Sequence, residues 1–116
     1  MTPLPPNLEI IRQQGRCCTG SGWWPIIDWF LEEILKSEPS AAAIDPANVE
    51  IKEKYGELSI YLVHDEFQNL QQVEELIRKA EEKSSHACEE CGKPAIARDV
   101  NGWVSTLCNE CFSTRK

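Results

Sequence analysis

The sequence predicts a small α+β domain in which helices pack on a β-hairpin and a cysteine-rich module follows them. Three observations predict it: three segments have apolar residues at helical spacing, one segment alternates with a period of two, and two C-x2-C pairs lie near the end. The length of 116 residues and the 41% hydrophobic content suit one modest core. We expect residues 1–85 to form a helix–helix–hairpin–helix body, with residues 86–116 packed on it as one unit.

The sequence of the first part of the body predicts two helices joined by a glycine-rich loop. Leu8 and Ile11 share one side of a helix around residues 8–14, which runs into the loop GRCCTGSG. Pro25 suits the first turn of the next helix, and Pro39 ends it. An apolar face wider than half the circumference predicts that this is the central helix of the fold. Its members are Ile26, Ile27, Trp29, Phe30, Leu31, Ile34 and Leu35.

The next segment, VEIKEKYGELSIYL, predicts a β-hairpin. Apolar and polar residues alternate from Val49, and the alternation resumes at Leu58 after a tight turn at Tyr55-Gly56-Glu57. We expect the second strand to be the more deeply buried one.

The last helix of the body is predicted over residues 66–85. Asp65 and Gln68 form an approximate capping box at its start. Glu74 with Arg78, and Glu75 with Lys79, are spaced for i,i+4 ion pairs. The apolar face consists of Phe67, Leu70, Val73, Leu76, Ile77 and Ala80.

Two cysteine pairs carry the clearest chemical signal in the chain. Cys88-x2-Cys91 and Cys108-x2-Cys111 are separated by sixteen residues, and Gly92 allows the first pair to turn back as a knuckle. This spacing predicts a Cys₄ zinc site in a zinc-ribbon or treble-clef-like module. A closed shell of four thiolates has no open position for water, so we expect the zinc to be structural.

Two disulfides, four unbound thiols, or iron in place of zinc are the alternatives at these cysteines. The sequence begins without the basic and apolar segments of a secretory signal, and it has no run of about 18 apolar residues. We therefore expect a cytoplasmic protein without a membrane anchor, in which reduced thiols bind metal.

Between the cysteine pairs, Asn101-Gly102 predicts a type I′ hairpin turn. Trp103 follows the turn, and we expect it to pack on the body rather than to stand exposed. Few residues follow Cys111, so little room is expected for a nucleic-acid-reading helix after it.

The charge distribution disfavours nucleic acid as a partner. The net charge of −7 falls on residues 1–85, because residues 86–116 hold four basic and four acidic residues. A zinc tetrathiolate would add a charge of about −2. Neither part would attract a polyphosphate strongly.

The segments CEECGKPAIAR and LCNEC resemble the zinc finger of DksA/TraR-type regulators, which bind RNA polymerase, and more loosely GATA-type fingers. The helical and hairpin segments upstream do not resemble either family, so these likenesses imply zinc and leave the partner open. The segments GWWPIIDWFLEEI, VEIKEKYGELSIYL and GWVSTLCNEC together resemble a recurring group of small phage, prophage and bacterial proteins. That resemblance implies one integrated domain of phage-like origin and implies no activity.

We expect a small intracellular zinc-binding protein that acts by protein–protein contact, as a phage-type regulator or inhibitor of a host protein and not as an enzyme. The candidate partner-binding residues are Trp23, Trp24, Tyr61 and Trp103. One of the two adjacent tryptophans is expected to be exposed. The oligomeric state stays open.

The alternative function is a nucleic-acid-binding or transcription-regulating zinc finger. It would use the basic residues of the module together with Trp103. These basic residues are Lys93, Arg98, Arg115 and Lys116.

Two weaker features have structural explanations. Adjacent Cys17 and Cys18 could be extra ligands or redox sensors, but we expect them to pack in the glycine-rich loop as small apolar residues. His64-Asp65-Glu66 resembles a catalytic cluster by composition alone, because the sequence places no nucleophile beside it.

Overall fold

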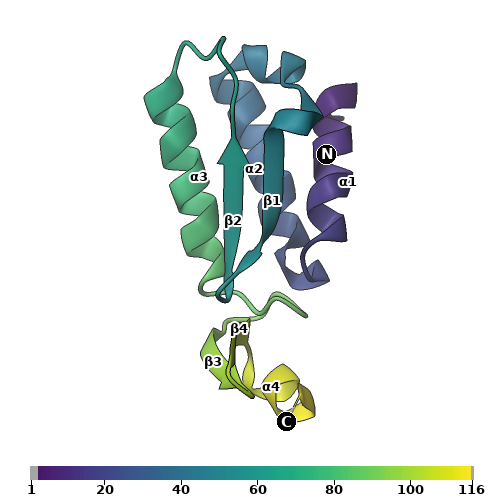
Figure 1. Ribbon diagram of the computed structural model, residues 1–116, viewed down its shortest axis with the longest axis vertical. Helices are drawn as coiled ribbons and strands as arrows, with labels where there is room; N and C mark the ends of the chain where they lie inside the picture. Colours follow the sequence, from purple (N-terminus) through teal and green to yellow (C-terminus); the bar gives the residue numbers. More distant parts are fainter. Residues whose placement is uncertain (1–2, 116) are drawn as a thin grey trace.

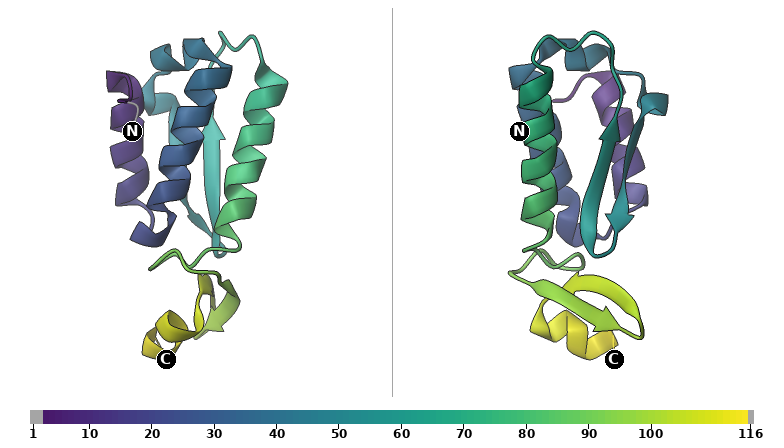
Figure 2. Two further views of the ribbon diagram at one scale, coloured as in Figure 1. Left: turned by 180° about the vertical axis from the view of Figure 1, so that it is seen from behind. Right: turned by 60° about the vertical axis from the view of Figure 1, so that its left-hand side comes forward.

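Three helices and a two-stranded hairpin form the body of the protein in the computed structural model, which describes residues 3–115 (Figure 1). The three helices lie side by side with α2 in the middle, and the hairpin covers one face of this layer (Figure 2). The mixture of helices and antiparallel hairpins confirms the predicted α+β class. The elements of the body are α1 (Pro6–Cys17), α2 (Trp24–Ser37), β1 (Val49–Lys54), β2 (Glu57–Leu62) and α3 (Leu70–Ser84), with 3₁₀ turns at Ser21–Trp23, Pro39–Ala43 and Pro46–Asn48.

The hydrophobic core lies between the helical layer and the hairpin. The apolar face of α2 supplies Ile27, Phe30, Leu31 and Ile34 to it, which explains why that helix carries so many apolar residues. The remaining buried members are Leu8, Ile11, Trp23, Ala41, Ile44, Ile51, Leu58, Ile60, Val73, Leu76 and Ala80.

A buried carboxylate fixes the start of α3. Glu38 is 2% exposed, and its oxygens accept hydrogen bonds from the backbone N–H groups of Gln68 and Asn69, both at 2.7 Å, and from the hydroxyl of Ser40 at 2.9 Å. The bond from Asn69 does most to hold the pKa of Glu38 below its ordinary value, against the raising effect of burial. Glu38 therefore does for α3 what the glutamate of a capping box does locally, since it accepts the N–H of the N-cap residue.

The predicted start of this helix was wrong. The helix begins at Leu70, not at residue 66, and its N-cap residue Asn69 makes no side-chain cap, so the expected capping box at Asp65 does not form. The ion pair that forms on the helix joins Arg78 to Glu75 at 3.7 Å, with i,i+3 spacing.

The hairpin β1–β2 has the predicted turn. Tyr55 and Gly56 have φ values of 54° and 82°, as a two-residue type I′ turn requires. Strand β2 is more deeply buried than β1, as predicted. Its outer edge is closed by α3, because the N–H of Leu58 donates to the hydroxyl of Ser84 at 2.8 Å and the N–H of Ile60 donates to the carboxylate of Glu81 at 3.0 Å.

The C-terminal module lies at one end of the body (Figure 1). Its elements are β3 (Ile96–Val100), β4 (Trp103–Leu107) and α4 (Asn109–Arg115). Asn101 and Gly102 form the predicted type I′ turn, with φ values of 55° and 85°. The order of knuckle, hairpin and helix is that of a treble clef. Helix α4 was not expected: it begins before Cys111 and so fits where the sequence suggested little room.

Candidate metal centre

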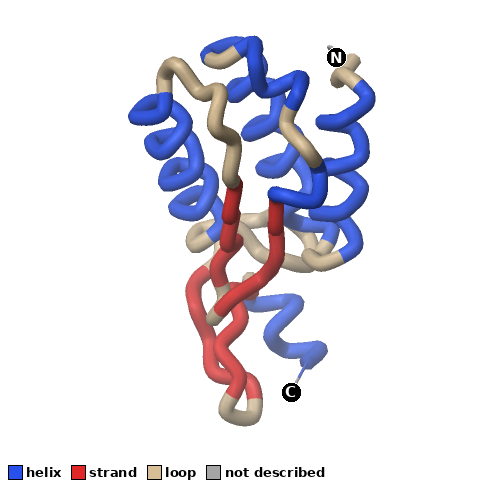
Figure 3. The backbone as a smooth tube through the Cα atoms, turned by 45° about the horizontal axis from the view of Figure 1, so that its top comes forward, coloured by secondary structure: helices blue, strands red, loops and turns tan. Residues whose placement is uncertain are grey.

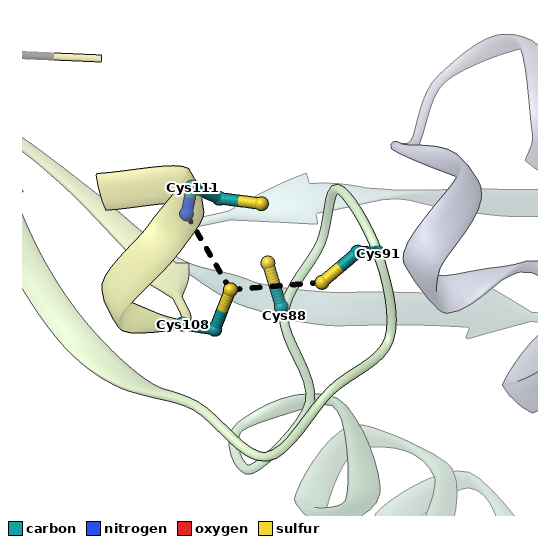
Figure 4. Close-up of side chains that lie close together, drawn as sticks. All are labelled: Cys88, Cys91, Cys108 and Cys111. Atoms are coloured by element: carbon teal, nitrogen blue, oxygen red, sulfur yellow. Dashed lines mark hydrogen bonds between the residues drawn. The ribbon is translucent and has the colours of Figure 1, made fainter. Parts of the chain in front are cut away.

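Four cysteine sulfurs converge where the two halves of the module meet. Cys88 and Cys91 come from the loop after α3, Cys108 follows β4, and Cys111 lies in the first turn of α4 (Figure 4). All four Sγ atoms lie within 4.8 Å of one another. Among residues 3–115, this is the one group of such side chains close enough to hold a metal ion.

The distances fit a metal–thiolate tetrahedron and not a disulfide. Zinc–sulfur bonds of about 2.3 Å place neighbouring sulfurs about 3.8 Å apart. The Sγ atoms of Cys91 and Cys108 are 3.6 Å apart, whereas a disulfide needs about 2.05 Å. The four thiols are therefore unpaired and arranged as a Cys₄ shell would be.

Backbone geometry shapes the knuckle around the first pair. Gly92 has φ of 83°, as its predicted role requires, and its N–H donates to the carbonyl of Cys88 at 2.8 Å. The N–H of Cys88 donates to the carbonyl of Lys93 at 2.8 Å. On the second pair, the N–H of Cys111 points at the sulfur of Cys108 from 3.5 Å.

The thiols differ in how readily they ionise. Burial raises the pKa of Cys88, but N–H groups of Cys108, Cys91 and Glu90 outweigh this effect and lower the pKa to about 7. Hydrogen bonding with the thiol of Cys108, together with burial, raises the pKa of Cys111 to about 12. The cluster therefore ionises readily at Cys88 and resists ionisation at Cys111. A cation at its centre would remove that resistance, since it offsets the repulsion between thiolates.

The glycine-rich loop docks directly on the knuckle. The N–H of Gly22 donates to the carbonyl of Glu89 at 2.9 Å, and the hydroxyl of Ser21 donates to the carbonyl of Glu90 at 3.2 Å. The indole N–H of Trp23 donates to the carbonyl of Ala87 at 2.8 Å. These three hydrogen bonds join segments more than 60 positions apart in the sequence.

Only glycine fits at position 22. A Cβ there would lie 2.0 Å from the carbonyl oxygen of Cys88 and 2.6 Å from the backbone nitrogen of Gly92. The sequence suggested a loop at this point but not a docking surface. The sequence feature that could have indicated this docking surface is Gly22 directly before Trp23, whose large side chain is buried in the core.

One further contact holds the module against the body, and another holds α4 against the knuckle within the module. The hydroxyl of Thr106 donates to the carbonyl of Gly56, so β4 lies against the turn of the first hairpin. At the end of α4, the guanidinium of Arg115 forms ion pairs with Glu89, at 2.9 Å, and with Glu90. The knuckle is thus contacted by the loop, by α4 through Arg115, and by β4, because the N–H of Glu89 donates to the carbonyl of Thr106 at 3.1 Å.

The candidate partner-binding residues separate into two groups. Trp23 is fully buried, so it is not available to a partner. Trp24 is half-buried, with the Arg16 guanidinium 5.1 Å from its ring centroid. Tyr61 and Trp103 are 65% and 66% exposed. The expectation that Trp103 packs on the body was wrong. The module docks through its knuckle and through Thr106 near the end of β4, whereas Trp103 lies at the start of β4, next to the turn at Asn101-Gly102.

The basic residues of the module make contacts within the protein. Lys93 lies 3.6 Å from Glu110, and Arg115 pairs with Glu89. Arg98 donates to the carbonyl of Leu107 at 2.8 Å, and its guanidinium lies 4.7 Å from the ring centroid of Phe112. Lys116 lies outside the described residues.

Cys17 and Cys18 are exposed at the end of α1, so the expected packing of these residues in the loop was wrong. His64, from the cluster His64-Asp65-Glu66, packs edge to face on Phe67 with ring centroids 4.8 Å apart.

Within residues 3–115, no helix combines the length and apolar character that a membrane crossing requires. Comparison of the chain with models of protein families, with curated proteins and with solved structures finds no match.

Proposed function

We propose that the protein binds one structural zinc ion through Cys88, Cys91, Cys108 and Cys111 and acts by contact with a protein partner, not by catalysis. The convergence of four sulfurs on one point supports the metal. The four protein ligands would fill a tetrahedral shell, which leaves no coordination position for a substrate or a reactive water.

The observation that carries the partner-binding part is the exposure of aromatic side chains on both hairpins. Tyr55, Tyr61 and Trp103 are all more than 60% exposed, although large aromatic residues ordinarily bury most of their surface. Tyrosine and tryptophan are also the residues that contribute most often to the energy of protein interfaces. The phage-type setting, as a regulator or inhibitor of a host protein, rests on the sequence resemblance alone.

A nucleic-acid-binding function is less well supported. Lys93, Arg98 and Arg115 are engaged within the module, and the chain carries a net charge of −7. Binding to phosphates would require these contacts to break against a repulsive field.

The metal is tested by purifying the protein without added metal ions and measuring its zinc and iron content. We expect about one zinc per chain, and a cobalt-substituted form with the absorption of a tetrahedral thiolate site. The variant Cys111→Ser should lose most of the metal, whereas Cys17→Ser should keep it. Equal metal content in both variants, or iron in place of zinc, would refute this part.

Partner binding is tested by capture from a bacterial lysate with and without nuclease. A photo-crosslinking residue at position 61 should capture a protein that survives nuclease treatment. The same residue at position 36 on α2, whose lysine side chain is 70% exposed, is the matched control. Recovery of nucleic acid without protein would refute the proposal.

A further inference from the structure

An open groove of about 550 Å³ lies between the tips of the two hairpins. Its size is that of sites which hold small molecules or short peptide segments. Figure 3 shows the strands of both hairpins on the same side of the molecule. We name this site the hairpin groove; its lining residues are Lys52, Glu53, Lys54 and Tyr55 from the first hairpin, and Gly102, Trp103 and Val104 from the second.

Tyr55 occupies a backbone conformation that a bulky side chain disfavours. Its φ is 54°, at the position of a type I′ turn where asparagine, aspartate or glycine is preferred. The second hairpin of the same protein has Asn101 at the matching position, with φ of 55°. The side chain of Tyr55 is 78% exposed, so packing does not offset the strain. Such strain at the rim of a groove indicates a binding role for this ring.

One lysine of the groove is placed to pair with a single anionic group on the ligand. Lys52 pairs with Glu50, and the carboxylate of Glu53 accepts the N–H of Gly56 at 2.8 Å. Lys54 makes no ion pair within residues 3–115, although, after the hydrogen bond from Lys52, its charge also helps to lower the pKa of the Glu50 carboxyl. The groove thus offers one ammonium group outside any ion pair of the described residues, beside the exposed rings of Tyr55 and Trp103.

We propose that the hairpin groove binds a short, extended, acidic segment of the partner protein. An apolar side chain of that segment, such as proline or an aromatic residue, contacts the rings of Tyr55 and Trp103, while a neighbouring carboxylate pairs with Lys54. This inference rests on the proposed function, since it takes the partner to be a protein. A nucleic acid strand could also stack on the rings, but its row of phosphates requires several cations, whereas the groove offers one lysine outside an ion pair of the described residues.

The test is a selection from displayed random peptides of about twelve residues on the zinc-loaded full chain. Enriched peptides should carry aspartate or glutamate close to proline or an aromatic residue. Their affinities are then measured by fluorescence anisotropy with labelled synthetic peptides. Trp103→Ala and Lys54→Glu should each weaken binding about tenfold or more.

Two variants separate binding from folding. Tyr55→Asn restores the preferred turn residue, so it should weaken binding about tenfold while the Tm stays the same or rises. Lys36→Ala changes an exposed side chain on α2 that does not line the groove, and it should leave the affinity within about twofold.

The proposal is overturned if no acidic peptide is enriched, or if the groove variants bind the enriched peptides as tightly as the unchanged protein. Tighter binding of single-stranded oligothymidine, lost in Trp103→Ala, would also overturn it in favour of nucleic acid. A partner protein that binds the groove variants with unchanged affinity refutes the hairpin groove and leaves the proposed function intact. Binding of nucleic acid alone refutes both.

Discussion

Replacing Gly22 with alanine tests whether the metal module and the body are one structural unit. The added methyl group would come within 2.0 Å of the carbonyl oxygen of Cys88, a backbone atom that cannot move without displacing the knuckle. The loop and the knuckle must therefore separate, and the hydrogen bonds made by Ser21, Gly22 and Trp23 are lost or weakened.

The size of the effect follows from these contacts. Three hydrogen bonds contribute about 1 kcal/mol each, and the indole N–H of Trp23, left without its acceptor in a buried place, adds about 1 kcal/mol or more. We expect Gly22→Ala to lower the free energy of unfolding by about 3–5 kcal/mol. This is a large part of the total for a domain of this size, which is typically about 5–15 kcal/mol.

The assay is urea unfolding of the zinc-loaded protein, followed by tryptophan fluorescence. Gly102→Ala is the matched control, because a methyl group there meets nothing within 4 Å and adds only the strain of a left-handed backbone, about 1 kcal/mol. If Gly22→Ala binds one zinc and loses no more stability than this control, the contact between loop and knuckle does not support the fold.

Three further predictions concern pH, metal affinity and turn strain. Because the folded-state pKa of Glu38 is depressed, its stabilising effect is complete above the ordinary carboxyl pKa of about 4.3 and is lost as pH falls through the lower folded value. The Tm of Glu38→Gln should therefore lie several degrees below that of the unchanged protein at neutral pH and approach it in acid; a constant gap would contradict the role of charge. Zinc must displace protons at least from Cys91 and Cys111, whose pKa values are raised, so its apparent affinity should fall about 100-fold for each unit decrease in pH. Competition with a chromophoric chelator measures this, and a pH-independent affinity would exclude a thiolate site. In urea unfolding, Tyr55→Asn should raise stability by about 1 kcal/mol and Asn101→Tyr should lower it by about as much, whereas equal stabilities would show that neither turn is strained.

The features predicted correctly from the sequence are those that depend on neighbouring residues. The turn at Asn101-Gly102 was predicted as type I′ from its residues, and a tight turn was predicted at Tyr55-Gly56-Glu57 from the glycine between two alternating segments. The grouping of the four cysteines follows from their pairwise spacing, because each C-x2-C turn brings two sulfurs to one point.

The features that were missed depend on contacts between distant segments. The N–H of Asn69 finds its acceptor on Glu38, 31 positions earlier, so no local pattern marks the start of α3. The burial of Trp23 and the exposure of Trp103 were equally hidden, because both tryptophans adjoin a glycine and only the docked arrangement decides which one is covered. Only the clash of a Cβ with the knuckle shows why Gly22 is needed.

The metal site and the hairpin groove are connected through one junction. Gly22 and Trp23 hold the knuckle from one side, while Thr106 on β4 holds the turn at Gly56 from the other. The knuckle can make these contacts only in its folded shape. The same contacts set the position of the second hairpin relative to the first, and this position defines the groove. Zinc bound at the four cysteines would then stabilise the proposed binding surface without touching the partner. Because such coupling is reciprocal, a peptide bound in the groove must also raise the affinity of the protein for zinc.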